Sequence, residues 1–187
     1  MKNITVISGH PNNENSISNH GIISHLEQSV IKDNLHVRVL ENLHSNFEFD
    51  IEKEQVALLE ADTIIFQFPL FWYSFPALMK KWIDDVICYG FAFGGEKGSQ
   101  LKDKKFIFSF TFGGQESAYG NEDEIALTIE ELMKPLIQIL KYCQVSDIDY
   151  VYSCNMLYIP NMYGSIDDIQ SRSVIHANKV LSMIECS

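Results

Sequence analysis

Short apolar runs alternate with amphipathic stretches along the whole chain. Apolar, β-branched runs that stop at Gly, Pro or polar residues are typical of buried strands. Apolar residues that recur every three or four positions are typical of helices, and the first such stretch presents Ile23, Leu26 and Val30 on one side. The pattern predicts strands at residues 4–8, 35–40, 63–68, 106–112 and 149–155, and helices from Ser16 onward and at 51–61, 76–88, 124–143 and 167–185.

The alternation of five strands with five helices defines the expected fold class. Most of the strands are apolar on both faces, which favours a parallel sheet covered by helices on both sides. Residues 41–50 are expected to form a loop, and Pro135 is expected to kink or break the helix that contains it. No internal repeat or linker interrupts the pattern, so residues 1–187 are predicted to form a single α/β domain.

The composition is that of a globular protein with an acidic surface. Hydrophobic residues make up 46% of the 187 positions and charged residues 21%, which excludes disordered and collagen-like classes. The formal net charge of −11 disfavours binding to nucleic acid or to anionic lipid. A local site for a phosphate group is still compatible with this charge.

The cysteines and the N-terminal segment indicate the compartment. Cys88, Cys143, Cys154 and Cys186 form no CxxC motif, and none lies at zinc-binding spacing from a histidine. We therefore expect free thiols in a reducing compartment and no metal site. The first apolar run is too short for a signal peptide, and no run approaches the roughly 18 residues of a membrane span. A soluble cytoplasmic protein is expected.

The loop after the first strand is a candidate phosphate site. Ligands of open parallel sheets bind at the carboxyl ends of the strands. This loop runs from Gly9 to the start of a helix, where backbone N–H groups and the helix dipole favour an anion. Its polar side chains include His10, Ser16, Ser18 and Asn19. The alternative is that Ser16 only caps the helix and His10 is a surface residue. Neither a Walker loop nor a GxGxxG motif occurs, which disfavours a classical dinucleotide fold.

Two further loops follow strands that are expected to end at the same carboxyl edge of the sheet. The loop at residues 68–76 carries four aromatic side chains beyond Phe68, where the strand ends, and they would form an apolar wall for a flat ring, or alternatively a local core plug. Residues 111–119 contain Gly113 and Gly114, whose backbone can approach a ligand closely, although such a pair is also common in simple turns. Tyr119 follows as a candidate hydrogen-bond donor or as an amphipathic surface residue. A phosphate site, an aromatic wall and a backbone edge together match flavin mononucleotide (FMN).

With these motifs the sequence resembles the flavodoxin-like NAD(P)H:quinone oxidoreductases, which include bacterial modulator of drug activity and potassium-efflux ancillary proteins. The resemblance spans most of residues 1–120, and the last third matches only in its strand–helix outline. The residues that carry it are Gly9-His10-Pro11 with Ser16 and Asn19, residues 55–62, the run from Phe66 to Tyr73, the run from Pro76 to Val86, residues 89–93 and residues 111–119.

The resemblance implies a flavodoxin-like three-layer sandwich, with a five-stranded parallel sheet and helices on both faces, that binds flavin. It implies that His10, Ser16, Ile17, Ser18 and Asn19 surround the phosphate. It implies that Pro69, Leu70, Phe71, Trp72 and Tyr73 follow the ring and the ribityl chain. It implies that Phe112, Gly113, Gly114 and Gln115 lie at the pyrimidine edge, and that Tyr119 faces the hydride acceptor.

The sequence departs from the family pattern at two of these positions. Phe71 stands where a Gln is common, so a polar contact is lost. The His that accompanies the tyrosine in some members falls at about Ile125, which argues against a Tyr–His relay. The chain also lacks the C-terminal extension of the longer FAD-binding members, which favours FMN and leaves FAD open.

The activity that the resemblance implies is reduction of the flavin by NAD(P)H followed by two-electron reduction of a quinone or similar acceptor. A homodimer with the site at its seam is also implied, and Phe47, Phe49, Tyr89, Phe91 and Phe93 are apolar residues in loop regions that suit an interface.

Three alternative functions share this fold. A one-electron flavodoxin carrier fits the acidity, but the aromatic and Gly-Gly loops argue against it, and carriers use a Thr-rich phosphate loop. A regulatory subunit of a potassium-efflux transporter remains open beside the enzyme. A response-regulator receiver needs an acidic cluster after the first strand, and Ser8-Gly9-His10 does not provide one.

Overall fold

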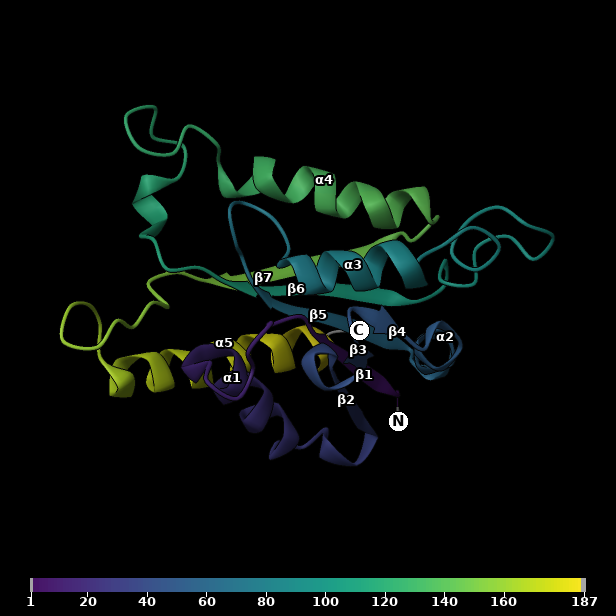
Figure 1. The fold of residues 1–187 in the computed structure, drawn as a ribbon, viewed down its shortest axis with the longest axis horizontal. Coiled ribbons are helices and arrows are strands. Elements are labelled where there is room, and N and C mark those ends of the chain that lie inside the picture. The colour runs from purple at the N-terminus through teal and green to yellow at the C-terminus, as the bar shows by residue number, and fades with distance from the viewer. Residues whose placement is uncertain (1, 186–187) are drawn as a thin grey trace.

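A parallel five-stranded sheet forms the centre of the computed structural model, which describes residues 2–185 (Figure 1). The strand order is β2-β1-β5-β6-β7, and neighbouring strands pair in parallel. The strands are β1 (Ile4–Ser8), β2 (Leu35–Val39), β5 (Thr63–Pro69), β6 (Lys105–Thr111) and β7 (Asp147–Ser153). The predicted α/β class, with its parallel sheet, is therefore confirmed.

Helices cover both faces of the sheet, as predicted (Figure 1). One face carries α1 (Ile17–Glu27) and α5 (Ile166–Glu185), which pack against each other and bury Ile22, Leu26 and Val180 with Val6 of β1. The opposite face buries apolar residues of α2 (Ile51–Glu60), α3 (Ala77–Val86) and α4 (Ile129–Tyr142) against β5 and β6. No helix among residues 2–185 is long and apolar enough to cross a membrane.

Burial along the strands follows their position in the sheet. Every residue of the inner strands β1 and β5 is buried, and so is every residue of β6 except Lys105. The edge strands β2 and β7 are partly exposed. The expectation of strands that are apolar on both faces is thus correct for the three inner strands and wrong for the edges, which have a neighbour on one side only.

Several local expectations are wrong. The expected loop at residues 41–50 contains the end of the short helix η2 (Leu40–Asn42) and an antiparallel pair, β3 (His44–Ser45) and β4 (Glu48–Phe49). Helix α1 ends at Glu27, so Val30 lies outside it and is 80% exposed. The other short helices are η1 (Lys32–Asn34) and η3 (Glu116–Ala118).

Helix α4 differs from its prediction at its start and at Pro135. It begins at Ile129 rather than at residue 124, because the Thr128 side chain accepts from the Glu131 N–H while the Glu131 carboxylate accepts from the Thr128 N–H. The helix runs through Pro135 without a break. Pro135 and Glu131 are both exposed, so water can reach the Glu131 carbonyl that loses its usual donor.

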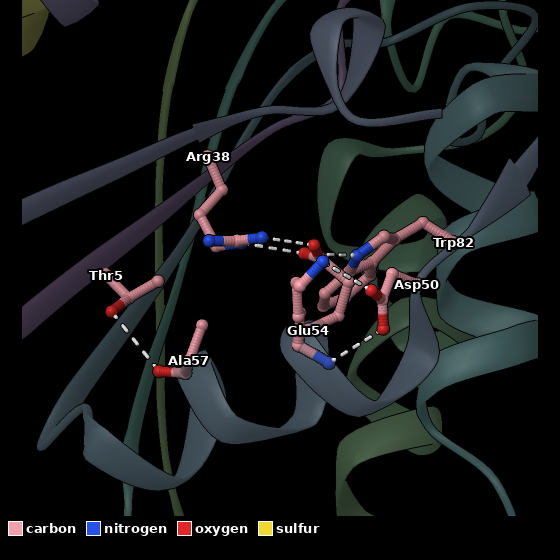
Figure 2. Close-up of polar contacts among 7 residues, drawn as sticks. Thr5, Arg38, Asp50, Glu54, Ala57 and Trp82 are labelled. Carbon is pink, nitrogen blue, oxygen red and sulfur yellow. Dashed lines mark hydrogen bonds and ion pairs between the residues drawn. The ribbon is translucent and has the colours of Figure 1, made fainter. Parts of the chain in front are cut away.

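One carboxylate joins three elements through an ion pair and a further hydrogen bond (Figure 2). Glu54 of α2 is 2% exposed, and its carboxylate accepts two hydrogen bonds from the Arg38 guanidinium of β2. The indole N–H of Trp82, a fully buried residue of α3, donates to the same carboxylate at 3.0 Å. At the start of α2, Asp50 accepts from the Lys53 N–H and caps the helix. Glu54 therefore fixes α2 against both β2 and α3.

Removal of the Glu54 carboxylate should destabilise the fold strongly. Glu54→Ala leaves Arg38 and the Trp82 N–H without their partner, and breaking a buried pair costs about 3 kcal/mol. The free energy of unfolding from urea denaturation measures this loss. The matched control is Asp84→Ala, which removes the exposed Lys80–Asp84 pair and should cost at most about 1 kcal/mol. Equal losses in the two variants would contradict the assignment of Glu54 as the link between these elements.

Candidate cofactor site

The carboxyl ends of β1, β5, β6 and β7 surround one pocket of about 310 Å³. This volume lies at the lower end of the range for small-molecule sites. The loops that leave this end of the sheet extend to the left in Figure 1. The pocket is lined by His10, Asn15, Ser16, Ile17, Ser18, Pro69, Leu70, Phe71, Thr111, Phe112, Gly113, Met156, Leu157, Tyr158 and Ile169.

The start of α1 presents backbone donors to this pocket. Ser16 is the N-cap, and its Oγ accepts from the Asn19 N–H at 3.1 Å. The Ser16 N–H itself donates to the Asn13 carbonyl. Within the described part of the chain, no protein acceptor is found for the N–H groups of Ile17 and Ser18. These two N–H groups lie at the positive end of the helix dipole, an arrangement that suits an anion.

His10 lies on the pocket wall as a neutral hydrogen-bond donor. Its Nδ1 accepts from the Asn12 N–H at 3.0 Å, so the proton of the neutral ring is on Nε2. Burial lowers the pKa of His10, while the charge of Glu41 opposes the shift. The ring meets Phe71 edge-on, with centroids 6.0 Å apart. His10 therefore offers this pocket a hydrogen-bond donor rather than a positive charge.

Asn19 does not face the pocket. It is fully buried, and its amide nitrogen donates to Ser8 Oγ at 2.9 Å and to Asn13 Oδ1 at 2.7 Å. Its amide oxygen accepts from Gln67 Nε2 at 3.0 Å. The side chain turns from the first turn of α1 toward the sheet, so its polar atoms are engaged inside the protein. This geometry opposes the direct phosphate contact that the family resemblance implies.

The aromatic loop contributes three of its five candidate residues to the pocket. Pro69, Leu70 and Phe71 line it. Trp72 and Tyr73 form the tip of a tight turn that is closed by two hydrogen bonds between Phe71 and Ser74, both 3.0 Å long. Both tip residues have left-handed backbone conformations, with φ of 45° and 65°. Neither tip residue lines the pocket, and Trp72 is 91% exposed.

The Gly-Gly loop places backbone rather than side chains at the pocket. Gly113 lines the pocket, and a Cβ there would meet the Leu157 side chain at 3.0 Å. Phe112 also lines it, while its N–H donates to the Ser153 carbonyl. Gly114 and Gln115 lie just beyond the lining residues, and the Gly114 carbonyl accepts from the Asn155 N–H at 2.9 Å.

Tyr119 packs beside this loop. Its ring lies 4.8 Å from the Phe112 ring, between centroids. Burial, together with the nearby Tyr73, raises the pKa of Tyr119, so its phenol stays protonated at neutral pH. The backbone of Ile125 pairs with that of Tyr119, at the position where the resemblance implies a histidine. The structure thus offers a phenol donor one side chain away from the pocket.

One wall of the pocket is not predicted from the sequence. Met156, Leu157 and Tyr158 follow β7, and Ile169 lies on α5. These residues read as ordinary apolar positions of a strand end and a helix. The available signal is topological, because the carboxyl end of β7 must lie at the same edge as the ends of β1, β5 and β6.

A second pocket of about 440 Å³ lies along the outer edge of β7. It is lined by Tyr152, Glu116 and the basic residues Arg172 and Lys179, among others. The Tyr152 hydroxyl donates to the Glu116 carboxylate at 2.6 Å, which raises the pKa of Tyr152 to about 12. This pocket lies beside a strand rather than at strand ends, so it is not the site expected for a ligand of a parallel sheet.

The fold and the site define a flavodoxin-like α/β protein. Residues 2–170 match the family model described as having a flavodoxin-like fold. The chain belongs to the flavodoxin-like NAD(P)H:quinone oxidoreductase family and is an oxidoreductase. It is 42% identical over 135 residues to the uncharacterized NAD(P)H oxidoreductase YrkL of Bacillus subtilis, covering 72% of this chain and 75% of the relative. It is 36% identical over 140 residues to KefF of an Enterobacter species, an ancillary protein of a glutathione-regulated potassium-efflux system, covering 75% and 76%.

Two solved structures share the fold across nearly the whole chain. General stress protein 14 of Treponema denticola, crystallised with FMN, superposes with a TM-score of 0.83 over 98% of each chain at 23% identity. An NADPH-quinone reductase of P. pentosaceus superposes with a TM-score of 0.71 over 96% of this chain and 97% of its own, at 27% identity.

The loop after β1 requires glycine at position 9. A Cβ on Gly9 would lie within 2.8 Å of three atoms of the Met79 side chain on α3. Gly9→Ala should therefore lower the free energy of unfolding by about 1–3 kcal/mol through overpacking. Met79→Gly removes all three obstructing atoms, Cβ, Cγ and Sδ, so the double variant should be less destabilised than the sum of the single variants. Additive losses in urea denaturation would show that the two positions do not compete for space.

Proposed function

We propose that the protein is an FMN-dependent NAD(P)H:quinone oxidoreductase. The observation that carries this proposal is the pocket itself, which is lined both by Ile17 and Ser18, whose N–H groups have no protein acceptor in the described part of the chain, and by the apolar side chain of Phe71. When bound there, FMN would supply the redox chemistry by accepting hydride from NAD(P)H and passing two electrons to a quinone or a similar acceptor. The names of the relatives, an NAD(P)H oxidoreductase and an NADPH-quinone reductase, support the same reaction.

The chain's residues divide between the two ends of the cofactor. The N–H groups of Ile17 and Ser18, the hydroxyls of Ser16 and Ser18 and the Nε2–H of His10 would hold the phosphate. Asn19 would not touch the phosphate. It would hold the start of α1 in place through its hydrogen bonds with Ser8 and Gln67.

The other end of the pocket suits a planar ring. Pro69, Leu70, Phe71 and Phe112 would flank the ring, and the Gly113 N–H would donate to its polar edge. We assign Gly114, Gln115, Trp72 and Tyr73 to the rim, where a second planar substrate would enter. The small pocket volume favours FMN over FAD. Cys88, Cys143 and Cys154 are free thiols, which supports a reducing cytoplasm, and we infer that residues 1–187 act there as one domain.

The backbone donor of Ile17 can be tested by removing only its N–H. Ile17 is the first residue of α1, where proline is well tolerated, and Ser16 is already extended with ψ of 106°. Ile17→Pro should weaken FMN binding about 10-fold or more, because a hydrogen bond to a charged group contributes about 1.5–3 kcal/mol. The control is Ile17→Ala, which keeps the N–H. Titration of apoprotein followed by flavin fluorescence measures both affinities, and equal values would remove this donor from the site.

Tyr119 should act on the electron acceptor. A protonated phenol at the rim can donate a hydrogen bond to the oxygen that gains charge in the acceptor. Tyr119→Phe should lower kcat for quinone reduction about 10-fold with little change in KM, because the apolar Ile125 leaves no partner for a relay. Stopped-flow kinetics separate the step with NAD(P)H from the step with quinone, and only the second should slow. An unchanged rate of quinone reduction would make Tyr119 a packing residue.

We propose a homodimer, although the structure revises the apolar patch on which the sequence prediction rests. Phe49 and Phe91 are buried in the core, whereas Phe47 and Tyr89 are 52% and 72% exposed. Tyr142 of α4 is also exposed and contacts Phe93. These exposed aromatic side chains are typical of an interface. Sedimentation equilibrium at micromolar concentration should give twice the monomer mass of 21.4 kDa, and a monomer would contradict the proposal.

A role beside a potassium-efflux transporter is the second candidate function. The identity of 36% to KefF, named as an ancillary protein of such a system, favours it. This role is compatible with the enzyme activity, since a bound flavoprotein can still turn over. Co-purification of the tagged protein with a membrane transporter would support this role, and its absence would contradict it.

A further inference from the structure

A continuous set of buried polar side chains lies below the pocket, on the face of the sheet that α1 and α5 cover. Ser8, Asn19, Gln67, Ser109 and His176 are each fully buried. None of them lines the pocket. Every buried polar side-chain atom in the described part of the chain has a hydrogen-bond partner, so the set is satisfied from within.

The strand register creates this set. Ser8 of β1 pairs with Gln67 of β5, and Gln67 pairs with Ser109 of β6. Two residues earlier on the same face, Val6 and Ile65 belong to an apolar cluster. This face of the sheet therefore changes from apolar to polar at Ser8, Gln67 and Ser109, close to the carboxyl ends of the strands and next to the loops that form the pocket.

The hydrogen bonds connect His176 of α5 to the loop after β1. The Ser109 hydroxyl donates to Gln67 Oε1 at 2.6 Å, so it accepts from His176 Nε2 at 2.7 Å. Gln67 Nε2 donates to Asn19 Oδ1, and Asn19 Nδ2 donates to Asn13 Oδ1. On the other side of the ring, His176 Nδ1 lies 2.9 Å from Ser153 Oγ. Burial lowers the pKa of His176 to about 4, so the ring is neutral and the set is unchanged across neutral pH.

Asn13, which accepts a hydrogen bond from Asn19, connects the set to the residue that caps α1. The Asn13 carbonyl accepts from the Ser16 N–H at 3.1 Å, and the Asn13 N–H donates to the Glu41 carboxylate. Asn19 also lies on the first turn of α1 and joins it to the end of β1. The positions of Asn13 and Asn19 thus set the direction of the Ile17 and Ser18 N–H groups.

We propose that His176 is a positioning residue, which acts through Ser109, Gln67 and Asn19 to hold residues 10–18 in the conformation that binds an anion. The part of this proposal that concerns FMN rests on the proposed function. Hydrogen bonds polarise one another in a buried environment. Loss of any one of these bonds should therefore loosen residues 10–18, which Asn13 and Asn19 hold in place.

The test compares two buried serines. Ser109→Ala interrupts the set, whereas Ser173→Ala removes a hydroxyl that is 1% exposed and bonds only the Ile169 carbonyl of its own helix. We expect Ser109→Ala to weaken FMN binding about 10-fold, because it removes the link between His176 and Gln67, and Ser173→Ala, which removes no bond of the set, to leave it within about twofold. Equal affinities in the two variants would overturn the proposal.

A second pair of variants tests His176 itself, which also covers the case in which Ser109→Ala does not fold. His176→Gln can place its amide nitrogen where Nε2 lies, whereas His176→Leu cannot bond Ser109. FMN affinity should be retained within about threefold in His176→Gln and lost about 10-fold in His176→Leu. Loss of affinity to the same extent in both would assign His176 to packing and overturn the proposal.

Amide hydrogen exchange of the apoprotein separates this inference from the proposed function. Exchange at residues 10–18 should rise about 10-fold in Ser109→Ala and not in Ser173→Ala, because only the first loosens the loop. If the wild-type protein fails to bind FMN, the proposed cofactor is wrong, and the exchange of this loop still decides the positioning role. Unchanged exchange in Ser109→Ala overturns it.

Discussion

The parallel register of β1, β5 and β6 is the constraint on which the site depends. It aligns Ser8, Gln67 and Ser109 across the sheet, just before the strands end. Apolar side chains below this position hold the sheet to α1 and α5, and the loops above it form the pocket. A shift of one residue in any of these pairings would turn a polar side chain into the apolar core on the opposite face. The register therefore determines both the stability of the sheet and the geometry of its carboxyl edge.

Much of the fold could be predicted from the sequence because the inner strands are short, apolar and clearly bounded. Pro69 and the Gly113-Gly114 pair mark where β5 and β6 end. The start of α4 could not be predicted from apolar spacing, because the acidic residues 122–124 read as a first helical turn. The capping interaction of Thr128 with Glu131 decides the boundary instead. Such an interaction depends on side-chain geometry more than on hydrophobic pattern.

The candidate site could be predicted as a meeting of loops, but not residue by residue. Phe71 and Gly113 follow strand ends directly, and parallel topology alone brings them to the pocket. Asn19 is different, because the sequence does not distinguish a side-chain amide that hydrogen-bonds inside the protein from one that hydrogen-bonds a ligand. His176 lies 67 residues from Ser109 on a helix with many polar positions, so only the packing of α5 on the sheet relates the two.

The turn between Phe71 and Ser74 carries two residues that its backbone conformation disfavours. Asn-Gly is the preferred pair where both central residues are left-handed, yet this chain carries Trp72 and Tyr73 there. Each bulky residue stores about 1–3 kcal/mol of backbone strain. Evolution for thermal stability alone would replace both aromatic rings, since an exposed tryptophan contributes little packing in return. An engineered stabilisation of this protein would therefore find its easiest gains at the rim of the pocket, where they would remove the two rings that stand beside it.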